Sequence, residues 1–335
     1  MKGKIIGFMI VCMLVSTFFA AAQPPVEIKD LENTGLVPQL VDDPVPVWEV
    51  GNSWTYKVNE IVIDFEQDNQ TIDVDLQIAS LPLQVTDASG GQYTVEFSTG
   101  ISGELYAHIM QDGEVFDISG NLLSSTITGT MYFDAATLGI AGVEAQIKGL
   151  MTLDVKQNNE SILPFLLPIP ATIDVNVDLE TPYTLLSFPL NTSSIWGLPG
   201  TNLSFDGTVQ SIWLNIINIV DTIIVMILGE ENAIIPPMYK HLFPIIDISD
   251  ALDEFGFVMP MPIPELPTIF SCFGMENVTV IGGTYEAYNI SMLGGLGYMF
   301  YAPEVKNIIK IDGAFADELP FVSDIEMELT STNVI

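Results

Sequence analysis

The residues that could do acid–base chemistry are few in this chain. Its only two histidines are His108 in "LYAHIM" and His241 in "MYKHLF", each among apolar residues and without a partner at a known motif spacing. A general base needs a hydrogen-bonding partner and a pKa near the working pH, and neither motif predicts one. The spacings typical of serine hydrolases, zinc proteases, phosphate-binding loops and redox dithiols are also absent from the sequence. We therefore expect no catalytic residues and a non-enzymatic protein.

Carboxylates are plentiful but do not follow a metal-binding pattern. Asp73 and Asp75 alternate with apolar residues, as expected on the solvent side of a strand, whereas Asp247, Asp250 and Asp253 lack the glycine and terminal glutamate of a calcium loop. We expect no metal site and no cofactor. Adventitious Ca²⁺ binding and a glycosidase-type carboxylate pair stay open, because such a pair forms in space rather than in sequence.

The cysteines predict neither a disulfide nor a reactive thiol. Cys12 lies in the N-terminal apolar run, so removal of that run leaves Cys272 alone in "TIFSCFGM". In such an apolar setting a cysteine usually acts as a small buried hydrophobic residue. Stability must then come from packing.

The charge balance excludes some partners. The chain has 43 acidic residues, nine lysines and no arginine, which gives a net charge of −34. Because nucleic acids and anionic headgroups are held mainly by Arg and Lys, we expect neither as a partner. An acidic surface is compatible with a high-salt habitat or an acidic exterior, and the sequence leaves both open.

The N-terminus predicts export. Two lysines precede an apolar run and Ala20-Ala21-Ala22, so residues 1–22 are typical of a cleaved signal peptide, although a retained anchor is the alternative. We expect a secreted protein or one on the outer face of the cell envelope, without a membrane span after cleavage. Six Asn-x-Ser/Thr sites are candidates for glycosylation. They are Asn69, Asn159, Asn191, Asn202, Asn277 and Asn289.

The elements that follow are mainly strands. Residues 23–46 are proline-rich and predict an extended arm, and from Trp48 apolar and polar residues alternate with a period of two. "TIDVDLQI", "QYTVEF", "MTLDVK" and "TIDVNVDLE" repeat this period, with turn residues such as Gly90-Gly91 between them. The pattern predicts one β domain over residues 47–335, built as a curved antiparallel sheet, a sandwich or an open barrel.

A segment of different character interrupts the alternation at about residues 205–275. "SIWLNIINIVDTIIVMILGEEN" is shorter than a membrane helix and has Asp221 near its middle, which argues against a membrane span. A helix with a narrow polar stripe at Asn215 and Asn218 fits better than two buried strands. We expect this helix to lie against the concave face of the sheet, either as permanent core or as a movable cover.

If the segment covers an apolar pocket, its aliphatic and methionine side chains are the candidate lining, because methionine adapts to irregular apolar ligands. The candidate residues are Trp213, Ile217, Val220, Ile224, Met226, Met259 and Met261.

Two short motifs carry a resemblance. "VWEVGNSWTYKV" resembles the W-x-x-G-x-x-W-x-Y opening strand of secreted prokaryotic β domains of uncharacterised function, and "GGTYEAYNIS" with "GYMFYAPEVKNIIKID" resembles their closing strands. The overall plan is similar to the open-barrel lipoprotein carriers of the LolA and LppX type, although this chain lacks their lipidated cysteine. The resemblance implies an extracytoplasmic role in binding a lipid-like ligand.

Three functions are compatible with the sequence. The first is non-enzymatic binding of a hydrophobic, lipid-like ligand in an apolar cavity. The second is a structural or adhesive cell-surface protein without a small-molecule ligand, and an enzyme of unrecognised type is third. A cavity beneath residues 205–275 would favour the first function, and a large exposed apolar patch the second. The oligomeric state and the ligand are not predicted.

Overall fold

The computed structural model describes residues 43–67, 70–111, 114–228, 245–247, 260–263, 265–314 and 324–334. The predicted signal peptide and most of the predicted arm lie outside these residues, as do His241, Asp250 and Asp253. The structure is 74% strand and 6% helix, in one large antiparallel sheet. The predicted mainly β class is therefore confirmed.

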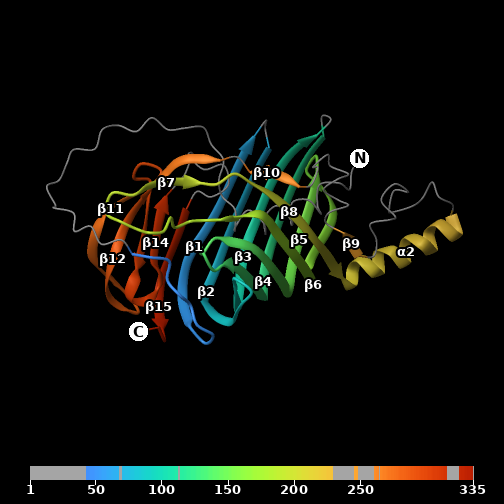
Figure 1. The fold of residues 1–335 in the computed structure, drawn as a ribbon. Helices are drawn as coiled ribbons and strands as arrows, with labels where there is room; N and C mark the ends of the chain where they lie inside the picture. Colours follow the sequence, from blue (N-terminus) through green and yellow to red (C-terminus); the bar gives the residue numbers. More distant parts are fainter. Residues whose placement is uncertain are drawn as a thin grey trace.

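The first half of the chain is an antiparallel meander of six long strands (Figure 1). Two of its turns lie at residues typical of turns in the sequence: Gly90 and Gly91 have φ of 65° and 79°, and Asn158 and Asn159 have φ of 50° and 67°. Left-handed backbone of this kind favours glycine and asparagine. The strands are β1 (Ser53–Gln67), β2 (Gln70–Ser89), β3 (Gln92–Gln111), β4 (Glu114–Asp134), β5 (Ile140–Gln157) and β6 (Glu160–Tyr183).

The second half adds shorter strands on both sides of this meander. The strand order is β10-β8-β6-β5-β4-β3-β2-β1-β15-β14-β13-β12-β11-β7, with β9 paired to β8. The elements are β7 (Ile195–Leu198), β8 (Thr201–Ser211), α2 (Ile212–Leu228), β9 (Ile245–Asp247), β10 (Met261–Ile263), β11 (Leu266–Val280), β12 (Gly283–Met292), β13 (Gly297–Ala302), the 3₁₀ turn η3 (Pro303–Val305), β14 (Asn307–Ala314) and β15 (Asp324–Thr332).

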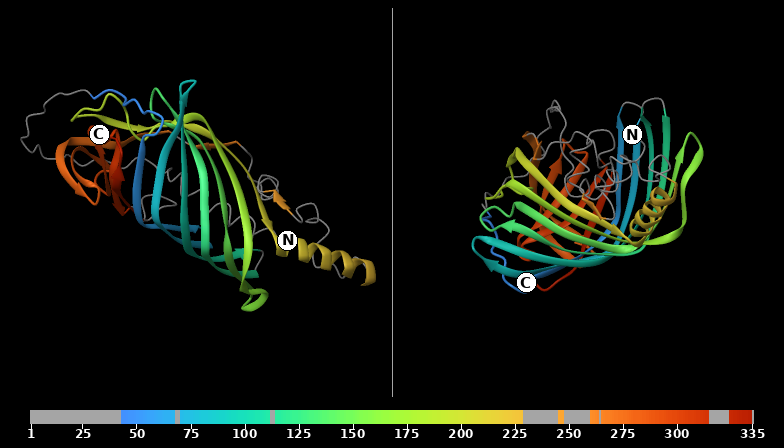
Figure 2. Two further views of the ribbon diagram at one scale, coloured as in Figure 1. Left: turned by 90° about the horizontal axis from the view of Figure 1, so that it is seen from below. Right: turned by 90° about the vertical axis from the view of Figure 1, so that its right-hand side faces the viewer.

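Two chain segments connect the two ends of this strand order. β7 leads into β8 across Pro199-Gly200, and β10 leads into β11 within a few residues. β7 pairs with β11, where the rings of Trp196 and Phe270 stack with centroids 5.4 Å apart, and β8 pairs with β10 opposite Leu203 and Met261. The sheet therefore curves round on itself, as Figure 2 shows.

The segment expected as an insertion contains more strand than predicted. β8 continues to Ser211 and β11 begins at Leu266, so both reach into residues 205–275. The side chains of β8 alternate between buried and more exposed along its length, which is the period of a half-buried strand. Of this segment, the structure describes a helix only at residues 212–228.

The two motifs of the resemblance contact each other directly. Trp54 donates from its indole Nε1 to the carbonyl oxygen of Val305 at 2.8 Å, and Trp48 donates in the same way to Lys306 at 2.9 Å. The Tyr56 hydroxyl donates to the carbonyl oxygen of Ile308 at 2.8 Å. The opening strand thus satisfies the backbone acceptors of η3 and of the start of β14. We call this arrangement the aromatic clamp.

Helix α2 follows β8 directly and extends away from the end of the sheet (Figures 1 and 2). The predicted helix is therefore confirmed. The expectation that it lies against the concave face of the sheet does not match this position. Within the described part of the chain, no helix has the length and apolar character needed to cross a membrane.

Candidate functional site

Five of the seven predicted lining residues belong to α2. Trp213, Ile217, Val220 and Ile224 occupy one side of this helix by their positions along it, and the side chain of Met226 is 79% exposed. The other two lie elsewhere: Met261 begins β10 opposite Leu203, and Met259 falls outside the described residues.

The exposed side of α2 carries four apolar residues beside the exposed Asn215 and Thr222, and three of the four were not singled out by the sequence analysis. Ile219 is 58% exposed, Ile223 48%, Met226 79% and Ile227 70%. We call these four residues the α2 apolar face. Residues spaced three and four apart lie on one side of a helix, so the sequence does predict that they share a side. The sequence analysis expected that side to be buried.

The opposite side of α2 holds a carboxylate. Asp221 is only 1% exposed, and at 100° per residue it lies about 180° around the helix from the α2 apolar face. Between them, Asn215 donates from its amide to the carbonyl oxygen of Ser211, and Thr222 donates from its hydroxyl to that of Asn218. A surface helix ordinarily buries its aliphatic residues and exposes its carboxylates, so α2 has the reverse arrangement.

Covering the α2 apolar face with another apolar surface would be favourable. Fully burying an Ile or Met side chain contributes about 1.5–3 kcal/mol, so covering the exposed parts of these four side chains would contribute about 4–8 kcal/mol. Exposed apolar patches of this kind mark interaction surfaces more often than they mark plain solvent-facing surface. The α2 apolar face is therefore our first candidate site.

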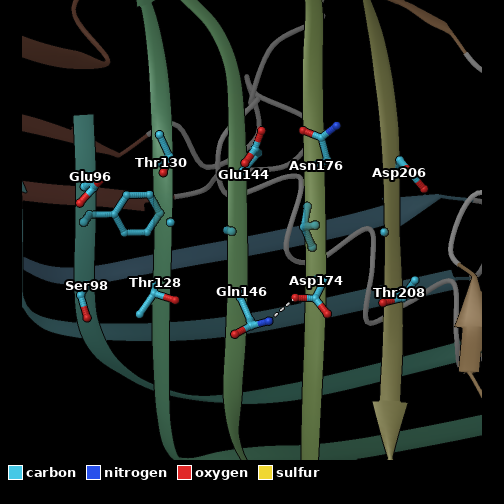
Figure 3. Close-up of a pocket in the computed structure, with 15 residues that line it drawn as sticks. Glu96, Ser98, Thr128, Thr130, Glu144, Gln146, Asp174, Asn176, Asp206 and Thr208 are labelled. Carbon is cyan, nitrogen blue, oxygen red and sulfur yellow. Dashed lines mark hydrogen bonds between the residues drawn. The ribbon is translucent and has the colours of Figure 1, made fainter. Parts of the chain in front are cut away.

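The structure also has an open hollow of about 860 Å³ on the sheet, lined by ten polar residues and by Phe97, Gly129, Ala145, Val175 and Gly207 (Figure 3). Five strands, β3, β4, β5, β6 and β8, line the hollow. Each contributes two polar residues at positions i and i+2, and the residue between them points to the opposite face of the sheet. Cross-strand pairing aligns these side chains in two rows. The first row is Glu96, Thr130, Glu144, Asn176 and Asp206, and the second is Ser98, Thr128, Gln146, Asp174 and Thr208.

The first row places a carboxylate on every second strand. Glu96, Glu144 and Asp206 are two strands apart from one another, which is about 10 Å at the usual strand spacing. Tyr132 donates to the Oε1 atom of Glu144 at 3.1 Å, and its pKa is raised by partial burial and by this carboxylate. In the second row, Gln146 donates to Asp174.

Gly129, a residue of the opposite face, has no room for a side chain. Gly129 lies between Phe97 and Ala145 in the cross-strand register, and a Cβ atom on Gly129 would meet the Phe97 ring at 2.5 Å. A side chain at this position would therefore collide with the core. The two rows of the hollow offer carboxylates, amides and hydroxyls, which suit hydrogen bonding to a polar ligand.

His108 has a partner that the sequence analysis missed. Its Nδ1 atom lies 2.7 Å from the Oδ1 atom of Asp117, and Tyr106 donates to the same oxygen at 3.5 Å. These residues lie on β3 and β4, where His108 pairs directly with Asp117. Cross-strand pairs of this kind on a partly exposed surface contribute up to about 1 kcal/mol to stability. Within the described residues, no group of three or more ligating side chains is placed to hold a metal ion.

The predicted glycosylation sites differ in accessibility. Asn159 lies in an exposed turn and Asn277 is exposed on β11, whereas Asn191 is only partly exposed. Asn202 and Asn289 are partly exposed and use their amides to bond Glu180 and Glu276, so a glycan there would replace these bonds. Asn69 lies outside the described residues.

Cys272 is buried, and burial raises the pKa of its thiol. A raised pKa lowers the fraction of reactive thiolate, which agrees with the expected unreactive residue.

Comparisons with known proteins give no family for this chain. No family model, no curated protein and no solved structure matches it. The resemblance to open-barrel lipoprotein carriers therefore stays a prediction that rests on two short motifs, and the site must be interpreted from its own geometry.

Proposed function

We propose that this protein is a non-enzymatic assembly protein of the extracellular face, and that it binds an apolar partner surface through α2. The observation that carries the proposal is the α2 apolar face: Ile219, Ile223, Met226 and Ile227 are between about half and four-fifths exposed on a helix that extends away from the sheet.

The packing of the sheet supports the same proposal. The core has two clusters of buried apolar residues, one including Phe97, Val143 and Val177 and the other around Trp54 and Tyr56. None of the core residues in either cluster comes from α2 within the described residues. The α2 apolar face is therefore not part of the core of the sheet. A binding role would give these exposed apolar side chains a function.

The hydrophobic-ligand function is the second candidate, and the α2 apolar face is also the observation in its favour. A lipid chain would bind there in place of a protein surface. The described hollow favours this candidate less than the α2 apolar face does, because two rows of carboxylates, amides and hydroxyls line it beside its apolar residues.

Binding of the apolar dye bis-ANS tests the proposed site. We expect the full chain to bind the dye, and the variant I219Q/I223Q/M226Q to lose at least about half of the fluorescence, because three of the four exposed side chains become polar. The variant I281Q is the matched control, since Ile281 is also 61% exposed but lies in the turn between β11 and β12. Equal dye binding by the triple variant and the wild type would overturn the proposal.

Native mass spectrometry with solvent extraction distinguishes the two candidates. An assembly protein should release no apolar molecule in stoichiometric amount. Recovery of one lipid per chain, lost in I219Q/I223Q/M226Q and kept in I281Q, would instead establish the hydrophobic-ligand function.

A further inference from the structure

We propose that the apolar partner is a second copy of this chain, and that two α2 helices pair side by side in antiparallel orientation. This inference rests on the proposed function, because it names the partner of the same helix face. The argument uses the spacing of the exposed residues, the distribution of charge and the position of the helix.

The spacing of the exposed residues is that of a coiled-coil seam. Ile219, Ile223 and Met226 follow one another at intervals of four and three residues, and Ile212 and Ile216 continue the same interval toward the start of the helix. Aliphatic residues with this alternation of three and four form the contact seam between two paired helices. Asp221 lies opposite the seam and is buried, whereas Ile219, Ile223 and Met226 are exposed.

The charge distribution favours a second copy over an anionic membrane. Asp221 is the only charged residue of α2, and the helix has no lysine, although basic residues are what hold a helix on anionic lipid. Each chain has a net charge of −34, so two copies repel one another over most of their surface. The uncharged α2 apolar face is a surface where they can meet without carboxylates opposing carboxylates.

The position of the helix favours the antiparallel orientation. α2 extends from the end of the sheet, so an antiparallel pair places the two acidic sheets at opposite ends of the paired helices (Figure 2). The 17 residues of α2 span about 25 Å. A parallel pair would instead bring both acidic sheets to the same end. Antiparallel helices also place opposite ends of their dipoles side by side, which is favourable. In the antiparallel register Ile219 packs against Ile223 of the second copy.

Sedimentation of the full chain over a range of concentrations tests the pairing. We expect a reversible dimer in wild type and in I281Q, and a monomer in I219Q/I223Q/M226Q. Added salt should strengthen the wild-type dimer, because it screens the repulsion between two acidic chains. A wild type that stays monomeric but binds bis-ANS through α2 would overturn the self-pairing and leave the proposed function intact. A triple variant that dimerises as well as wild type would also overturn the self-pairing.

Thiol cross-linking tests the orientation and does not depend on the stability of the triple variant. Buried Cys272 should not react, and C12S removes the other thiol of the full chain, so in a C12S background I219C and I223C each place one reactive thiol on the seam. With a short bifunctional thiol linker, we expect an equal mixture of the two variants to cross-link several-fold more than either variant alone. Efficient cross-linking of I219C alone would indicate a parallel pair, and no cross-linking in any sample would overturn the pairing.

Discussion

The aromatic clamp and α2 show opposite uses of large apolar side chains. In the clamp, Trp54 and Tyr56 are buried and their polar atoms donate to backbone carbonyls more than 250 residues away. On α2, Ile223 and Met226 are exposed and a carboxylate is buried. The buried side chains of the clamp therefore contribute to the stability of the fold, whereas the exposed side chains of the α2 apolar face contribute little within one chain.

The largest effect should come from the clamp. We expect Trp54→Ala to lower the free energy of unfolding by about 3–5 kcal/mol, because it leaves a large cavity and an unsatisfied carbonyl at Val305. Urea unfolding followed by circular dichroism measures the change. Trp54→Phe keeps most of the apolar volume and should cost less, about 1–3 kcal/mol. A loss below 1 kcal/mol in Trp54→Ala would show that the clamp does not stabilise the fold.

Alkaline pH should lower the free energy of unfolding. Burial raises the pKa of Tyr56, Tyr183 and Tyr301. Above pH ~10 the unfolded chain loses these phenolic protons while the folded chain keeps them, so the stability that is fully present below that pH is lost as pH rises. Tyr56→Phe should cost about 0.5–1.5 kcal/mol at neutral pH and make the alkaline decline shallower. Urea unfolding at several pH values checks both, and an unchanged slope in Tyr56→Phe would contradict the expected role of Tyr56.

The smallest effect on stability should come from α2. We expect I219Q/I223Q/M226Q to change the free energy of unfolding by no more than about 0.5 kcal/mol when measured at concentrations where the chain is a monomer, because these side chains are exposed in one copy. The same measurement on I281Q gives the baseline for an exposed apolar residue. A loss of more than about 2 kcal/mol in the triple variant alone would place α2 in the core and remove the contrast with the clamp.

Much of the fold could be predicted from local pattern. The alternation in "TIDVDLQI" and "TIDVNVDLE" predicted strands with one polar side, and these segments lie in β2 and β6. The helix over residues 212–228 was also predicted, from its narrow polar stripe. Such features depend on neighbours within a few residues, so a single sequence contains them.

The candidate sites could be predicted less well, because they depend on distant partners. The helix was expected to cover the sheet since apolar side chains usually lie inside, yet Met226 and Ile227 are exposed. The pairing of His108 with Asp117 was missed because a cross-strand neighbour depends on where the hairpin turns. The same holds for the first row of the hollow, whose members come from five strands.

The sequence by itself determined the period of each strand, the position of the turns and the helical segment, since these follow from backbone preferences and from the spacing of apolar residues. Only the tertiary structure decided which strands pair in which register, that Trp54 meets Val305, and that α2 presents its aliphatic side outward. The physical reason is that these contacts join residues far apart in the chain, where the free energy depends on the packing of the whole sheet.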